Sequence, residues 1–185
     1  MDKLLICGRS CSGKDTYARE LEKHGLKGVC SYTTRPRRDG EGDTHIFITE
    51  DEVKNYPNKI AITEINGYTY FATKEQLEEA DYYIIDPLGI KTLQQNYPDI
   101  PFKIVYMYAP TELRKQRAVQ RGGAKEEQVF EKRNESEDGQ FTEFEQNMTS
   151  YDLILHRNTK DDPEFIQRCV IYDLYGLLTG EVFQS

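Results

Sequence analysis

The stretch CGRSCSGKDT, residues 7–16, directly follows the apolar run LLI at residues 4–6. Its glycines, Gly8 and Gly13, allow the backbone to curl so that successive amide N–H groups point inward at a phosphate. Lys14 can then contact the phosphate group that is transferred, and the following helix presents its positive N-terminus to the anion. A strand before the loop and a helix after it are the context that this motif requires. The stretch therefore predicts a nucleotide phosphate site.

The residue after the lysine is Asp15, where such loops ordinarily carry a hydroxyl that binds magnesium. A carboxylate is also a hard oxygen ligand for Mg²⁺, whereas Thr16 is an imperfect substitute because the next helical position points about 100° away. Two interpretations of Asp15 stay open: a magnesium ligand, or a favourable acidic residue at a helix N-terminus. The expected ATP-binding residues are Gly8, Arg9, Ser10, Cys11, Ser12, Gly13, Lys14, Asp15 and Thr16.

Length and composition limit the class of protein. The 185 residues suit one domain with a real core, and no apolar run approaches the ~18 residues of a membrane span. We therefore expect a cytoplasmic protein without a signal peptide and without membrane contact. A net charge of -8 argues against long nucleic acid as a partner. The four cysteines form no CxxC pair, which favours reduced thiols over a disulfide framework or a zinc site.

Short apolar runs alternate with helical patterns along the chain. Strand patterns occupy residues 3–7, 28–32, 81–86, 102–109 and 152–156. The strict alternation of strands and helices predicts βαβ units and a parallel sheet, with ligands at the carboxyl ends of the strands.

Two segments interrupt this alternation. Between residues 32 and 73 the pattern changes to the period-two runs THIFIT, KIAITEI and YTYFAT, and the turn Asn66-Gly67 separates the last two. This pattern predicts a small antiparallel insert. The second segment is RGGAKEEQ, residues 121–128, where a glycine pair precedes a charged helix start and indicates a hinged lid.

Four motifs together resemble one family. They are the phosphate loop, SYTTRPRRDGE at residues 31–41, IIDPLG at residues 84–89, and RAVQRG…EKR at residues 117–133. In this order they resemble guanylate kinases and their relatives, from Leu4 to about Asn158. Four separated motifs in the correct order are far more specific than any one of them.

The resemblance implies an α/β fold, with a P-loop NTPase-type parallel sheet flanked by helices, a small antiparallel monophosphate-binding insert and a lid. It also implies one domain over residues 1–185. The expected segments are a core of residues 1–31, 74–121 and 140–185, the insert of residues 32–73, and the lid of residues 122–139.

The resemblance further assigns residues to the acceptor nucleotide. Ser31, Arg35 and Arg38 match residues that hold its phosphate, Tyr70 matches a phosphate-binding tyrosine, and Asp86 matches an acidic residue that reads guanine. The expected substrate-binding residues are Ser31, Arg35, Arg38, His45, Glu64, Tyr70 and Asp86.

A third set is expected to act on the transferred group. Arg117, Arg121 and Arg133 match lid arginines that close over the phosphates. The chemistry agrees, because planar guanidinium groups clamp phosphate oxygens, and phosphoryl transfer requires mainly positioning and charge neutralisation. The expected catalytic residues are Lys14, Arg38, Arg117, Arg121 and Arg133.

The sequence departs from the family at positions that bear on the base and the metal. His45 stands where a second phosphate-binding tyrosine is usual, and Ala72 where a small hydroxyl contacts the base. Glu64 is the nearest carboxylate for the guanine edge. Ile84 replaces a second aspartate that helps to organise magnesium, and we hypothesise that Asp15 supplies this lost charge.

The leading functional interpretation is ATP- and Mg²⁺-dependent phosphorylation of GMP or dGMP, in purine nucleotide metabolism, by a monomer or weak homodimer whose partners are small nucleotides. Three alternatives stay open. One is a kinase for ribose 1,5-bisphosphate, another is a kinase for other deoxynucleoside monophosphates, and the third is a phosphopeptide-binding module without catalysis. The complete phosphate loop argues against the last, and Arg35 with Arg38 argues against the first.

Overall fold

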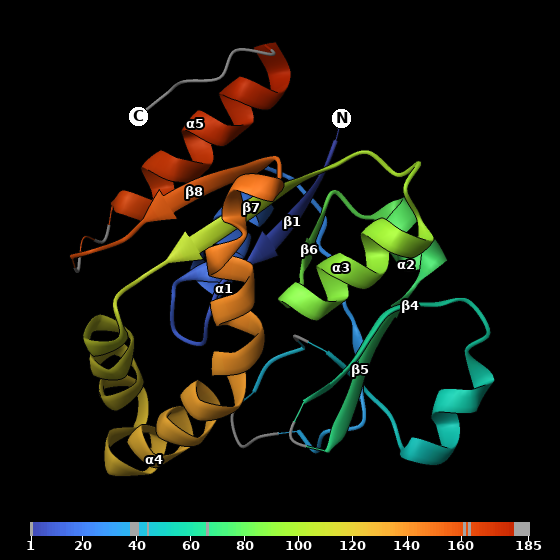
Figure 1. Ribbon diagram of the computed structural model, residues 1–185, viewed down its shortest axis with the longest axis horizontal. Helices are drawn as coiled ribbons and strands as arrows, with labels where there is room; N and C mark the ends of the chain where they lie inside the picture. Colours follow the sequence, from blue (N-terminus) through green and yellow to red (C-terminus); the bar gives the residue numbers. More distant parts are fainter. Residues whose placement is uncertain are drawn as a thin grey trace.

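A computed structural model describes residues 2–37, 41–43, 45–65, 67–160, 162 and 164–179. At its centre is a four-stranded parallel sheet in the order β6-β1-β7-β8 (Figure 1). Its strands are β1 (Lys3–Cys7), β6 (Tyr82–Ile84), β7 (Phe102–Tyr108) and β8 (Leu153–Arg157). The expected class, an α/β fold with a parallel sheet flanked by helices, is confirmed.

Both faces of this sheet are covered, which is why its strands are almost continuously apolar. Successive side chains of a strand point to opposite faces. Leu4 and Ile6 of β1 therefore pack on one side with α1 and α5, whereas Leu5 and Cys7 pack on the other side with α2, α3 and the end of α4. The helices are α1 (Lys14–Lys23), α2 (Lys74–Glu79), α3 (Pro87–Asn96), α4 (Thr111–Gln146) and α5 (Phe165–Thr179). None of the described helices carries an apolar stretch that could cross a bilayer.

A second sheet lies beside the first, in the order β3-β2-β5-β4 (Figure 1). Its strands are β2 (Tyr32–Thr33), β3 (Ile46–Phe47), β4 (Lys59–Ile65) and β5 (Tyr68–Thr73), and a 3₁₀ helix (Glu50–Asn55) joins β3 to β4. The β4–β5 hairpin is antiparallel, as its pattern predicts, but β2 and β3 pair in parallel. The strand pattern of residues 28–32 reaches the main sheet only through one isolated bridge between Gly28 and Tyr82.

Helix α4 has two arms that meet at a glycine pair. Gly122 (φ −159°, ψ 22°) and Gly123 (φ 63°, ψ −148°) are not helical, and the second conformation strongly favours glycine. We call residues 111–121 the proximal arm and residues 124–146 the distal arm. The arms are bridged by Lys115, whose ammonium lies 2.9 Å from the carboxylates of both Glu127 and Glu131.

A buried polar cluster ties α1 to the C-terminal part of the fold. The carboxylate of Asp173 on α5 accepts hydrogen bonds from the Tyr17 hydroxyl on α1 and, at 2.7 Å, from the His156 ring on β8. Burial by itself lowers the pKa of His156, but hydrogen bonds to Asp173 and Cys169 outweigh burial and raise it to about 9. His156 therefore stays protonated at neutral pH.

This cluster predicts a pH dependence of stability. Because the folded pKa of His156 lies above the usual 6.5, its contribution is complete below pH 6.5 and is lost as the pH rises through about 9. We expect the free energy of unfolding to fall by on the order of 3 kcal/mol across this range. Urea titrations of the wild type and of His156→Gln between pH 6 and 10 measure this pH dependence of the free energy of unfolding. An equal slope in both proteins would contradict the prediction.

Candidate functional site

The loop between β1 and α1 is curled as its sequence pattern predicts. Gly8 lies so close to β7 that a Cβ there would be 2.5 Å from the Met107 carbonyl oxygen and 2.6 Å from Ser12 Oγ. Cys11 (φ 64°) and Gly13 (φ 109°) both have left-handed backbone conformations. Successive N–H groups in such a turn form an anion-binding concavity. The Ser12 hydroxyl is buried without a hydrogen-bond partner among the described residues, which fits a site that is completed by a ligand.

We expect Gly8→Ala to destabilise the protein by about 1 to 3 kcal/mol, because the new methyl group overlaps the main-chain carbonyl oxygen of Met107, which cannot easily move. The matched control is Gly139→Ala, since this glycine lies within the distal arm and a Cβ would meet nothing within 4 Å. The control should be neutral or stabilising by up to ~1 kcal/mol. Chemical unfolding measures both variants, and a stability loss in Gly8→Ala no larger than that of the control would contradict the close approach.

Three arginines of the proximal arm reach the loop itself. Arg117 donates to the carbonyl oxygens of Cys11 and Ser12 at 3.2 and 3.3 Å, and Arg121 donates to Cys11 Sγ. The buried Arg114 donates to the Ser10 carbonyl at 3.3 Å. These arginines share one face of the helix, as their spacing predicts. Two further expected catalytic residues, Lys14 in the first turn of α1 and Arg133 on the distal arm, are half-buried.

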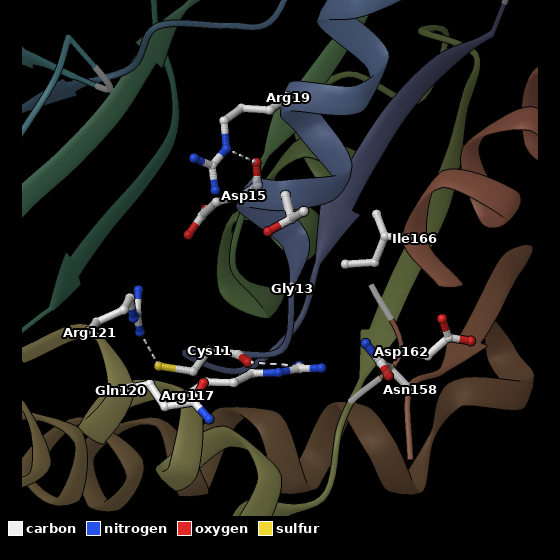
Figure 2. A pocket seen from close by; sticks show the side chains of 11 residues that line it. Cys11, Gly13, Asp15, Arg19, Arg117, Gln120, Arg121, Asn158, Asp162 and Ile166 are labelled. Atoms are coloured by element: carbon white, nitrogen blue, oxygen red, sulfur yellow. Dashed lines mark hydrogen bonds between the residues drawn. The ribbon is translucent and has the colours of Figure 1, made fainter. Parts of the chain in front are cut away.

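A cavity of about 350 Å³ opens next to the loop. Figure 2 shows that its walls come from the loop and the start of α1, the proximal arm, the segment after β8 and the start of α5. Asp15 and Thr16 both line it and both are exposed. Asn158 lines it as well, with only 2% of its surface exposed, and no motif in the sequence includes this residue. Its position after the carboxyl end of a predicted strand was the one sequence feature that could have indicated a role in ligand binding.

The second cluster of expected residues gathers on the β2–β5 sheet. Arg35 is buried and forms a bidentate pair with Glu41, with N···O distances of 2.9 and 2.6 Å. Hydrogen bonds to Glu41 raise the pKa of Arg35, although its burial lowers that pKa. Arg35 Nε is buried without a hydrogen-bond partner in the part of the chain that the structure describes. Sequence reasoning missed the role of Glu41, since no local spacing indicates which carboxylate an arginine chooses.

Ser31, His45 and Tyr70 lie together beside this pair. Ser31 Oγ is 2.9 Å from His45 Nδ1, and the rings of His45 and Tyr70 meet edge to face at 5.9 Å. Burial lowers the pKa of His45, and the charge of Arg35 lowers it further, whereas Asp15 acts in the opposite direction. Asp15 is thus close enough to act on this cluster electrostatically. Arg38, expected to hold the acceptor phosphate, lies outside the described residues.

Asp86 occupies the N-cap position of α3, and its Oδ1 accepts a hydrogen bond from the Gly89 amide at 2.8 Å. Burial raises its pKa, while hydrogen bonds from Gly89 and Thr63 lower it. The structure brings the buried Thr63 to Asp86, whereas Glu64 is exposed on the other side of β4. Thr63 rather than Glu64 is therefore the neighbour of Asp86 in this part of the site.

The described residues contain no group of three or more His, Cys, Asp or Glu side chains that could hold a metal ion. This does not conflict with a magnesium site at Asp15, because Mg²⁺ is usually held by one or two carboxylates together with substrate phosphates and water. An exposed carboxylate next to an anion-binding loop fits that arrangement, with Asp15 as the residue that would hold the ion.

Similar folds occur in solved structures of low sequence identity. A guanylate kinase from Anaplasma phagocytophilum is 17% identical, with a TM-score of 0.60 over 100% of this chain and 88% of that chain. TT1252 from Thermus thermophilus is 16% identical, with a TM-score of 0.50 over 98% of both chains. A deoxyadenosine kinase from M. mycoides with bound dCTP is 14% identical, with a TM-score of 0.50 over 94% of this chain and 99% of that chain.

At these identities the likeness concerns the fold, and for the fold the resemblance to guanylate kinases is confirmed. No curated protein matches the sequence. A family model described as AAA domain matches residues 4–141, which include the phosphate loop, the second sheet, the proximal arm and most of the distal arm. Since the match covers well over half of the chain, the protein belongs to the AAA domain family.

Proposed function

We propose that the protein is a nucleoside monophosphate kinase that transfers the γ-phosphoryl group of ATP to GMP or dGMP. The main support for this proposal is that two groups of residues suited to phosphate lie near each other. One is the curled loop with Lys14, and the other is the cluster of Ser31, Arg35, His45 and Tyr70. The effect of the Asp15 carboxylate on the pKa of His45 supports their close approach. The fold shared with a guanylate kinase supports the same reaction.

The reaction requires little covalent chemistry from the protein. An oxygen of the acceptor phosphate forms a bond to the γ-phosphorus, the bond to the β,γ-bridging oxygen breaks, and ADP leaves with that electron pair. Lys14, Arg117 and Arg121 offset the negative charge of the transferred group. Asp15 would hold Mg²⁺, and the bound ion would supply further neutralisation of phosphate charge. For Arg117 and Arg121 this role requires their present contacts with Cys11 to exchange for contacts with phosphate.

The test of this function is phosphoryl transfer from ATP to a panel of acceptors: GMP, dGMP, AMP, CMP, UMP and ribose 1,5-bisphosphate. We expect GMP or dGMP to be preferred, because the Asp86 carboxylate can accept from guanine N1 and N2, which adenine cannot match. Lys14→Ala should lower turnover by about 100-fold or more. Lys23→Ala is its control, since this lysine lies on the same helix in an exposed pair with Glu20.

The outcomes separate the alternatives. Preference for ribose 1,5-bisphosphate would reject a nucleotide acceptor, and a preference for another deoxynucleotide would reject guanine as the base. Absence of transfer to every acceptor, with binding of a phosphopeptide instead, would favour a module without catalysis. Near-normal turnover in Lys14→Ala would contradict the whole assignment.

Asp15 generates a separate prediction about magnesium. If its carboxylate supports the ion, Asp15→Asn should raise the Mg²⁺ concentration for half-maximal activity severalfold, while nucleotide affinity without metal changes little. Asp15→Ser should be milder because it restores a hydroxyl, and Thr16→Ala should matter little. If Asp15 only favours the helix N-terminus, its loss costs about 0.3 to 1 kcal/mol of stability and leaves the magnesium requirement unchanged. Magnesium titrations of the three variants distinguish these accounts.

A further inference from the structure

The second residue of the phosphate loop, Arg9, is held by the distal arm of α4. Its guanidinium forms a bidentate pair with Glu145, with both N···O distances 3.0 Å, and a third contact of 3.0 Å with Asp138. It also donates to Thr142 Oγ1 at 3.2 Å and lies over the ring of Phe141, 5.5 Å from the ring centroid. Residues with this spacing share one face of a helix. One face of the distal arm is therefore built around a single loop side chain.

The Arg9–Glu145 pair is shielded from solvent and anchored on both sides. The Arg9 side chain is 12% exposed, and Glu145 also accepts a hydrogen bond from the Tyr106 hydroxyl on β7. Burial lowers the pKa of Arg9, but the hydrogen bonds to Glu145 and Asp138 outweigh it and raise that pKa. Burial raises the pKa of Glu145, whereas Arg9 and Tyr106 lower it. The pair consequently stays charged, and a bidentate geometry fixes orientation as well as distance.

The next loop residue is held by the same arm. The Ser10 amide donates to a carboxylate oxygen of Glu137 at 2.9 Å, and the Ser10 hydroxyl donates to the other oxygen. Cys11 follows directly, with a left-handed φ of 64° that is unusual for a residue with a side chain. Such a conformation costs about 1 to 3 kcal/mol and persists only when the surroundings impose it. The distal arm holds the two residues that precede this strained position.

We propose that Arg9 and Glu145 are positioning residues, whose ion pair holds the phosphate loop in its anion-binding curvature and couples it to the distal arm. The kinetic part of this inference rests on the proposed kinase function, whereas the effect on loop geometry does not. A loop that loses this contact opens its turn at Cys11, so the amide groups no longer converge on a phosphate. The triphosphate site is impaired, and the acceptor cluster on the second sheet is left intact.

The kinetic test compares Glu145→Gln, Arg9→Gln and Arg9→Lys with the wild type. We expect the KM for ATP to rise about 10-fold in the two Gln variants, since the ion pair is reduced to a weaker contact between one charged and one neutral group. The KM for the acceptor should not change. Arg9→Lys should be intermediate, because an ammonium keeps the charge without the bidentate geometry. Lys74→Gln is the control, since Lys74 forms an exposed pair with Glu78 on α2.

A second measurement follows the conformation of the loop and does not depend on enzymatic activity. Cys7 and Cys169 are buried, so in a Cys30→Ser background Cys11 is the thiol that iodoacetamide reaches. We expect Glu145→Gln to raise the rate of Cys11 alkylation at least fivefold. Sodium tripolyphosphate should slow the reaction in the wild type more than in the variant. Thermal melting of both proteins verifies that they are folded.

These readouts keep the two proposals separate. Faster alkylation of Cys11 in Glu145→Gln, together with a wild type that phosphorylates no acceptor, would support the positioning role while rejecting the kinase. An unchanged alkylation rate in folded Glu145→Gln, or equal increases in the KM for ATP and for the acceptor, would overturn the positioning role.

Discussion

The close approach of the Gly8 main chain to β7 is the constraint on which the rest of the site depends. A methyl group at this position would collide with the carbonyl oxygen of Met107, so only glycine lets the loop turn directly at the end of β1. From that turn the chain passes through the left-handed Cys11 and Gly13 into the N-terminus of α1. The loop amides that could face a phosphate follow this turn in the chain.

Helix α4 surrounds this loop with two chemically opposite arms. The proximal arm presents arginines, which donate to loop carbonyl oxygens, and the distal arm presents carboxylates, which accept from Arg9 and Ser10. The kink at Gly122 and Gly123 makes this possible, because a straight helix could offer only one of its ends to the loop. The same helix thus carries candidate ligands for phosphate and the side chains that hold the phosphate-binding backbone.

Asp86 illustrates how one residue can serve fold and site together. Its carboxylate caps α3 through the Gly89 amide, which orients one oxygen, and the hydrogen bond from Thr63 constrains it further. Burial disfavours the charged form, so a ligand donor that pairs with this carboxylate is bound more strongly than it would be in water. A side chain that is already fixed by the fold loses little entropy when a ligand binds to it.

Local patterns in the sequence were sufficient for the main architecture. The loop glycines, the apolar strands and the glycine pair of α4 act on their own neighbours, so the strand-loop-helix unit, the parallel sheet and the break near Gly122 could all be predicted. The antiparallel β4–β5 hairpin followed for the same reason. The likeness to guanylate kinases in fold could also be predicted, because its motifs are short and ordered along the chain.

Tertiary structure decided the contacts between distant segments. Arg9 and Glu145 are 136 positions apart, and no periodicity links an arginine to one of many carboxylates at such a distance. The bulge in β4 between Ile60 and Thr63 shifts the alternation of its side chains, which is why Thr63 rather than Glu64 faces Asp86. The parallel pairing of β2 with β3 likewise depends on the path of the connecting segment, since a period-two pattern specifies a strand and its buried face but leaves its direction open.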